Sequence, residues 1–171
     1  MSTIPSTAFT EFKSYSEQGH LLLAVTLSTK IKNTEEGERF IESKNFRGLW
    51  DRHLVGEFQN LLPKKKHWSL DHWYRLHSVP AYHFHGIVVI HRDYADRVWS
   101  NGVLRKRLIR TLNSWRKNSK GTRPCEVPQF HITRLANSPD ECAEYNSWGA
   151  DAISFWMNYA AHESKTSTTN K

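Results

Sequence analysis

Two strand-like segments separated by only two residues constrain the fold of this chain most strongly. Trp73–Val79 and Tyr82–His91 are rich in the β-branched and aromatic residues that favour strands. The Pro80-Ala81 connection between them is short enough for a hairpin. A parallel pair would need a crossover of about a dozen residues or more, so we expect these two strands to pair antiparallel.

The spacing of apolar residues elsewhere predicts two more strands and three helices. His20–Thr29 is a continuous aliphatic run typical of a buried strand, and Pro128–Leu135 alternates like a half-exposed one. Apolar residues recur at helical spacing over Phe46–Leu62, Val103–Asn118 and about Ala150–His162. The order β-α-β-β-α-β-α predicts a single α+β domain, in which a central antiparallel sheet carries helices on one side.

The length and composition are typical of one soluble domain. The 171 residues divide into an N-terminal extension (1–19), a folded domain (20–162) and a disordered tail (163–171). No apolar run approaches the roughly 20 residues of a membrane helix, and the N-terminus lacks the pattern of a secretory signal. The two cysteines, Cys125 and Cys142, are too few for a disulfide framework. We therefore expect a cytoplasmic protein with no membrane partner.

Positive charge is in excess and is concentrated in one segment. The chain has 24 Lys and Arg against 17 Asp and Glu, a formal net charge of +7, which favours a polyanionic partner. Residues 101–124 contain no acidic side chain, and Lys64–Lys66 form a second basic cluster. A solvated surface would also account for such charges. The candidate DNA contacts lie on the predicted helix Val103–Asn118: Arg105, Lys106, Arg107, Arg110, Arg116 and Lys117.

A pair of histidines on one predicted strand is the strongest chemical signal. His83 and His85 are two residues apart, so both side chains project from the same face of the strand, where two imidazoles can hold a divalent cation. Gly86 leaves room beside them for a ligand or for another backbone. His77, on the neighbouring strand, is the candidate third ligand. Histidines that only make hydrogen bonds on a half-exposed strand are the alternative. Two less well placed candidate ligands lie upstream: Asp71 and His72.

The predicted final helix carries the candidate nucleophile, Tyr159. A tyrosine hydroxyl is a poor nucleophile at its ordinary pKa of about 10, but beside a metal-bound phosphate it becomes competent. His162 follows at i+3 on the same side of the helix and could assist or orient the hydroxyl. Tyr145 is the rival nucleophile, and Tyr159 could instead be one more aromatic residue of an apolar helix.

The tryptophans are candidates for two different roles. Exposed aromatic rings can stack on unpaired bases, and Trp68, Trp73 and Trp115 are the candidates for that role. Each of these three could equally belong to the core. We assign Trp99 and Trp156 to the core outright.

The order of these features resembles the HUH endonucleases. In that superfamily a first strand with a threonine, here Val25-Thr26-Leu27, and a helix precede a strand with a His-hydrophobic-His motif, here His83-Phe84-His85. Leu76-His77 is similar to the neighbouring-strand element that supplies a third ligand. Tyr159–His162 resembles the tyrosine motif, in which lysine commonly occupies the last position. One tyrosine in this helix resembles the single-tyrosine class.

The resemblance implies a fold, a reaction and partners. The fold would be the ferredoxin/RRM-like nuclease fold of the superfamily. The enzyme would be a sequence-specific nickase and strand transferase for single-stranded DNA. His83, His85 and His77 would hold Mg²⁺ or Mn²⁺, and Tyr159, assisted by His162, would form a 5′-phosphotyrosine. Such an enzyme would initiate rolling-circle replication of a plasmid or phage-like element at single-stranded or hairpin origin DNA. A host helicase is a further expected partner, because the chain has no Walker-type phosphate loop.

Three other functions stay open at this point. A single-tyrosine transposase of the same superfamily would use the same chemistry. A non-catalytic single-stranded nucleic-acid-binding module would not need affinity for a divalent metal. His131-Ile132-Thr133 fits the motif of two-histidine phosphoesterases, but the sequence offers no good second copy.

Overall fold

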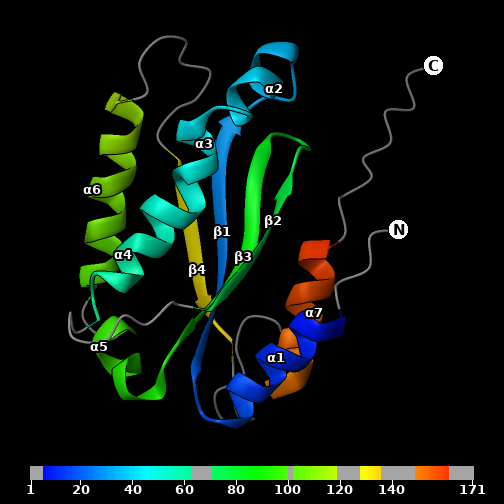
Figure 1. Ribbon diagram of the computed structural model, residues 1–171, viewed down its shortest axis with the longest axis vertical. Coiled ribbons are helices and arrows are strands. Elements are labelled where there is room, and N and C mark those ends of the chain that lie inside the picture. Colours follow the sequence, from blue (N-terminus) through cyan, green and yellow to red (C-terminus); the bar gives the residue numbers. More distant parts are fainter. Residues whose placement is uncertain (1–5, 63–70, 100–101, 119–127, 136–148, 162–171) are drawn as a thin grey trace.

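The computed structural model describes residues 6–62, 71–99, 102–118, 128–135 and 149–161. In these residues four strands form one antiparallel sheet with the order β2-β3-β1-β4 (Figure 1). The strands are β1 (Leu21–Ile31), β2 (His72–His77), β3 (Tyr82–Ile90) and β4 (Gln129–Arg134). The α+β class, the single domain, the hairpin and the antiparallel sheet are therefore confirmed, and the strand order is that of a ferredoxin-like βαββαβ unit.

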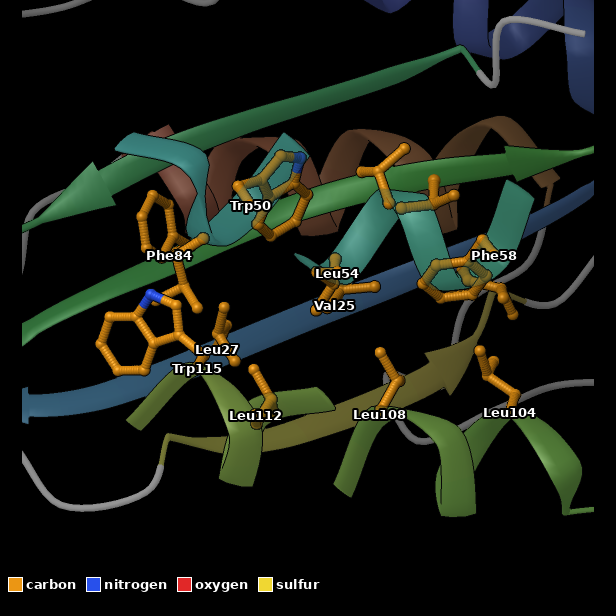
Figure 2. Close-up of a cluster of buried hydrophobic side chains, with 14 of the residues drawn as sticks. Val25, Leu27, Trp50, Leu54, Phe58, Phe84, Leu104, Leu108, Leu112 and Trp115 are labelled. Carbon is orange, nitrogen blue, oxygen red and sulfur yellow. The ribbon is translucent and has the colours of Figure 1, made fainter. Parts of the chain in front are cut away.

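One face of the sheet, called here the first face, packs against helices from the middle of the chain. The predicted helix Phe46–Leu62 is a continuous run of three pieces, α3 (Lys44–Gly48), the π-helical η1 (Leu49–Val55) and α4 (Gly56–Gln59). The basic helix α6 (Val103–Asn118) has the predicted bounds. Figure 2 shows Leu104, Leu108 and Leu112 pointing from α6 toward β1, where Val25 and Leu27 meet them in the main hydrophobic core.

The opposite face, called the second face, is also covered by helices. Leu22, Ala24, Ile87 and Val89 form a separate buried cluster with α7 (Gly149–Ala161) and with Phe12 of α1 (Ser6–Glu17). Figure 1 shows α1 and α7 lying next to each other, away from α6. The prediction that helices lie on one side only is thus wrong. A strand that is aliphatic at every position, as at the start of β1, is buried on both faces and needs a cover on each.

The N-terminal segment contains a helix that the sequence reasoning left within an extension. Helix α1 contributes Phe12 to the second-face cluster, with Phe9 and Tyr15 partly buried beside it. Its many polar residues make the apolar stripe weak, which is why periodicity missed it. The other short elements are α2 (Glu35–Ile41), the 3₁₀ turn η2 (Arg92–Tyr94) and α5 (Ala95–Trp99).

The tryptophans divide differently from the prediction. Trp156 is buried, as expected, but Trp99 is 41% exposed at the end of α5, so its assignment to the core is wrong. Trp115 is buried and donates a hydrogen bond from Nε1 to the backbone oxygen of Asn45, so it offers no surface for stacking. Trp73 packs partly buried under the second-face cluster.

Several predicted features lie outside the described residues. They are Lys64–Lys66, Trp68, Cys125, Cys142, Tyr145, His162 and the tail 163–171. In the part of the chain that is described, no helix is long and apolar enough to cross a membrane.

Candidate functional site

Three histidines meet on the second face, at the hairpin end of the sheet. The β2–β3 register pairs His77 directly with His83, and His85 follows two residues along β3. The ring centres lie 5.1 Å apart for His77 and His83, 5.0 Å for His77 and His85, and 4.8 Å for His83 and His85. The strand alternation that places His83 and His85 on one face therefore also brings His77 to them, across the hairpin.

Each of these imidazoles uses one ring nitrogen in a bond to an oxygen atom. His77 Nε2 lies 2.5 Å from the backbone oxygen of Ala160, and His83 Nδ1 lies 2.7 Å from that of Ala81. A backbone oxygen only accepts, so both of these nitrogens donate, and in a neutral ring the opposite nitrogen is the one that carries the lone pair. His85 Nδ1 lies 3.0 Å from the hydroxyl oxygen of Thr26. Partners of this kind orient the histidines of metal sites.

His85 is held in its neutral form. Burial, followed by the nearby His83 and His77, lowers the pKa of His85 to about 3. An imidazole in this environment is neutral at any physiological pH. In the tautomer whose Nδ1 donates to the hydroxyl oxygen of Thr26, the opposite nitrogen, Nε2, can accept a bond or bind a cation.

The spacing of the three rings is compatible with a shared metal ion. A metal–nitrogen bond of about 2.1 Å puts a ring centre about 3.2 Å from the ion, so ligands roughly 90–110° apart have ring centres about 4.5–5.2 Å apart. Among the described residues, however, no three His, Cys, Asp or Glu side chains are arranged to hold a metal as they stand. The bond from His77 to Ala160 fixes that ring, so His83 and His85 are the better placed pair and His77 would have to turn or bind through Nδ1.

Helix α7 places Tyr159 beside the histidines. Trp156 donates a 3.0 Å hydrogen bond from Nε1 to the backbone oxygen of Gly86, which ties the helix to β3 next to His85. The centre of the Tyr159 ring lies 5.1 Å from that of His85 and 5.5 Å from that of Trp156. Because the buried side of α7 is formed by Ile153, Trp156 and Met157, Tyr159 lies on the flank of the helix and is 53% exposed. About half of the Tyr159 residue surface is therefore open to solvent.

The two upstream candidates lie away from this cluster. His72 pairs with Val88 at the far end of β2 and lies 3.1 Å from the carboxylate of Asp51. Asp71 accepts a 2.7 Å hydrogen bond from the hydroxyl of Tyr15; this bond, together with burial, raises the pKa of Tyr15 to about 12. Neither residue is placed to share a ligand with His83 and His85.

Gly86 serves packing rather than ligand binding. A Cβ atom at this position would lie 2.5 Å from the Trp50 ring and closer still to the backbone oxygen of Trp73. The space beside the histidine strand is therefore filled on the first face by Trp50 and at the edge by β2. The expectation of room for a ligand is wrong, whereas the expectation of a close backbone is confirmed.

The basic helix lies on the other side of the sheet from Tyr159. Helix α6 packs on the first face, whereas the three histidines and α7 occupy the second. Arg107 is held in a 2.8 Å ion pair with Glu57, which also accepts a hydrogen bond from Thr111. The side chain of Lys117 is outside the described residues. The cations that α6 exposes to solvent are Arg105, Lys106, Arg110 and Arg116.

A polar strip extends from the histidines across the second face, and sequence reasoning did not identify it as part of the site. Thr26 lies between His85 on β3 and His131 on β4, and Ser28 lies between His83 and Gln129 in the next row. Gln129 and His131 are exposed. The alternating pattern of the predicted strand Pro128–Leu135 contained this signal, but only the strand order reveals that β4 lies two strands from the histidines.

Comparison with family models, with curated proteins and with solved structures found no match to this chain. The fold and the arrangement of side chains therefore carry the functional argument.

Proposed function

We propose that this protein is a divalent-metal-dependent endonuclease of the HUH type, which nicks and rejoins single-stranded DNA with Tyr159 as the nucleophile. The position of Tyr159 carries the proposal. Its exposed ring lies 5.1 Å from His85, which shares one site with two further imidazoles. The proposed substrate is the single-stranded or hairpin origin of a plasmid or phage-like element, and the proposed role is initiation of rolling-circle replication in the cytoplasm with a host helicase.

The proposed reaction is an in-line transfer of a phosphoryl group. The Tyr159 oxygen attacks phosphorus and forms a new P–O bond, while the bond from phosphorus to the 3′ oxygen of the preceding nucleotide breaks. The tyrosine proton passes to a base, for which the sequence offers His162, and the 3′ oxygen takes up a proton from solvent. The 5′ end stays on Tyr159 as a phosphodiester, so a free 3′ hydroxyl can reverse the step without ATP.

The histidines fit the binding of the metal that such a reaction uses. His83 and His85, with His77 as the third candidate, would hold Mg²⁺ or Mn²⁺, which would polarise the scissile phosphate and neutralise its developing charge. The neutral state of His85 supports this role, because a protonated imidazole cannot bind a cation. The hydroxyl of Thr26 would keep the His85 ring oriented.

The basic helix would hold DNA away from the cleavage site. Arg105 lies over the ring of Phe130 on β4, 5.7 Å from the ring centre, so the positive charge of α6 adjoins the β4 edge of the sheet. On the second face, the polar strip of Thr26 and His131 leads from that β4 edge to the three histidines. A DNA strand that passes round the β4 edge would contact both the basic helix α6 and the polar strip.

A covalent-adduct assay tests the proposal. Wild-type protein is incubated with a pool of labelled single-stranded oligonucleotides of mixed sequence, with Mn²⁺ or with EDTA, and is run on a denaturing gel. We expect a shifted protein–DNA band that requires Mn²⁺ and is lost in Tyr159→Phe. Tyr74→Phe is the matched control, because Tyr74 is also partly exposed but packs against Trp50 on the first face. A band that persists in Tyr159→Phe would refute the assignment of the nucleophile.

A binding module without catalysis is the second candidate, and one observation favours it. All three imidazoles already have an oxygen partner, and within the described residues no three potential ligands are arranged to hold a metal. Tight, salt-sensitive binding of single strands without an adduct and without Mn²⁺ affinity would support this candidate. A single-tyrosine transposase would form the same adduct but would join the strand to a second DNA molecule.

A further inference from the structure

Helix α7 exposes two aromatic side chains that are neighbours on its surface. Phe155 is 48% exposed and Tyr159 is 53% exposed. They are four residues apart, so they lie on the same flank of the helix, one turn from each other. The remaining large apolar side chains of α7 are buried against the sheet: Ile153, Trp156 and Met157. The exposure of Phe155 thus comes from its place on the helix and not from loose packing of α7.

The position of Phe155 relative to Tyr159 suits contact with a neighbouring nucleotide. One helical turn advances about 5.4 Å, and each nucleotide of a stacked strand adds a rise of about 3.4 Å along the strand axis, so the two rings are separated by the span of one or two nucleotides. A strand whose phosphate lies at Tyr159 would therefore bring a base of the adjoining nucleotide to Phe155. An exposed aromatic ring can stack on such a base whatever its sequence.

The other aromatic rings of the described residues are poorly placed for this role. Trp115 is buried in the first-face core, and Trp73 is partly buried against the second-face cluster. Tyr74 is partly exposed but contacts Trp50 on the first face. Trp99 is exposed at the end of α5, which adjoins α6 rather than α7. Phe155 is the exposed ring that shares an element with the proposed nucleophile.

We propose that Phe155 is a positioning residue, which stacks on the unpaired base of a nucleotide next to the scissile phosphate and so holds that phosphate at Tyr159. This inference rests on the proposed function, because it takes single-stranded DNA as the ligand. It assigns a role to an apolar side chain that is 48% exposed beside the proposed nucleophile. The stacking surface is then Phe155 and not Trp73 or Trp115, which are at least partly buried.

Binding of two matched oligonucleotides tests the inference. Fluorescence anisotropy gives the Kd for a labelled mixed-sequence 20-mer pool and for a fully abasic strand of the same length. Phe155→Leu keeps an apolar side chain and a good helix former but removes the ring. We expect it to weaken binding of the 20-mer by about 5-fold to 140-fold, the loss that corresponds to one stacked base, and to leave binding of the abasic strand unchanged.

Two further variants separate stacking from a general disturbance of α7. Phe155→Trp should restore the wild-type Kd, because it restores an aromatic face. Asn158→Ala, at an exposed position on the same helix, should bind both strands as wild type does. The inference would be overturned if Phe155→Leu kept the wild-type Kd for the 20-mer. It would also be overturned if this variant lost as much affinity for the abasic strand as for the 20-mer.

The adduct assay run in parallel keeps this inference distinct from the proposed function. With an oligonucleotide that wild type cleaves, Phe155→Leu should raise KM by a similar factor and change kcat less. If wild type forms the adduct but Phe155→Leu binds the 20-mer as tightly as wild type does, the stacking role is refuted and the nickase is not. If wild type forms no adduct but Phe155→Leu still loses affinity for the 20-mer only, the nickase is refuted and the stacking surface stands.

Discussion

The bond between Thr26 and His85 gives the sharpest test of the proposed metal site. The two polar atoms lie 3.0 Å apart, on neighbouring strands whose register pairs these residues. Thr26→Val removes the hydroxyl but keeps the β-branched shape that a strand favours. The ring of His85 is buried, so its Nδ1 would lose a partner that water cannot easily replace.

The size of the effect follows from that burial. A polar atom left unpaired in the interior costs about 1–3 kcal/mol, and about 1.4 kcal/mol corresponds to a tenfold change in an equilibrium constant. If this free energy is lost from the orientation of His85 that binds the metal, Thr26→Val should weaken Mn²⁺ binding by about 5-fold to 140-fold. Losses of about 10-fold to 100-fold are usual when the partner of a metal-binding histidine is removed.

Isothermal titration calorimetry with Mn²⁺ measures this affinity directly. Ser28→Ala is the control, because it removes a hydroxyl from the same strand and the same face, one row away, without altering the Thr26–His85 bond. A Thr26→Val affinity within twofold of wild type would refute the reasoning that this hydroxyl orients His85. Wild-type protein that takes up no Mn²⁺ at all would refute the metal site itself.

Three further predictions concern packing, acid stability and charge. Gly86→Ala would put a Cβ atom 2.5 Å from the Trp50 ring, an overpacking that we expect to cost about 3 kcal/mol and to lower Tm by about 6–12 °C; a change below about 2 °C would contradict this. Burial alone would raise the pKa of Glu57, but hydrogen bonds from Thr111 and Arg107 and the charges of Arg107 and Arg110 outweigh it and lower that pKa below its ordinary value of 4.5. The stabilisation is therefore complete above about pH 4.5 and is lost as the pH falls through the lowered value, so urea unfolding of Glu57→Gln should show a shallower acid decline than wild type. The third change replaces three exposed cations of α6 with glutamine: Arg105, Lys106 and Arg110. It should lower the slope of log Kd against log salt for single-stranded DNA by up to about 2, at about 0.7 for each phosphate contact. An unchanged slope would exclude α6 as a DNA surface.

Sequence reasoning was most accurate where a feature depends on neighbouring residues. The predicted bounds of Val103–Asn118 match α6, because its apolar residues follow a clear helical period. The segments Trp73–Val79 and Tyr82–His91 match β2 and β3 to within a few residues. It was wrong about Trp99 and about helices on one side only, because composition does not say which surface a side chain will meet.

In the candidate site, too, some features follow from neighbouring residues and others depend on how the strands pair. That His83 and His85 share a face follows from the two-residue period of a strand, and the sequence alone is enough to state it. That His77 faces His83, and that Thr26 bonds to His85, depends on the register of β3 against β2 and β1. A shift of one residue in either pairing would send those side chains to the opposite face.

The strands, the basic helix and the placement of two histidines on one face could be predicted from the amino-acid sequence alone, because each of these is set by a period of two or 3.6 residues within a short segment. The tertiary structure alone decided that α7 lies on the second face with Tyr159 beside His85, and that α6 lies on the first face. Both depend on contacts between segments far apart in the chain, such as the bond from Trp156 to Gly86. The physical reason is that apolar periodicity marks which side of an element is buried, but the partner that buries it is chosen by packing over the whole domain.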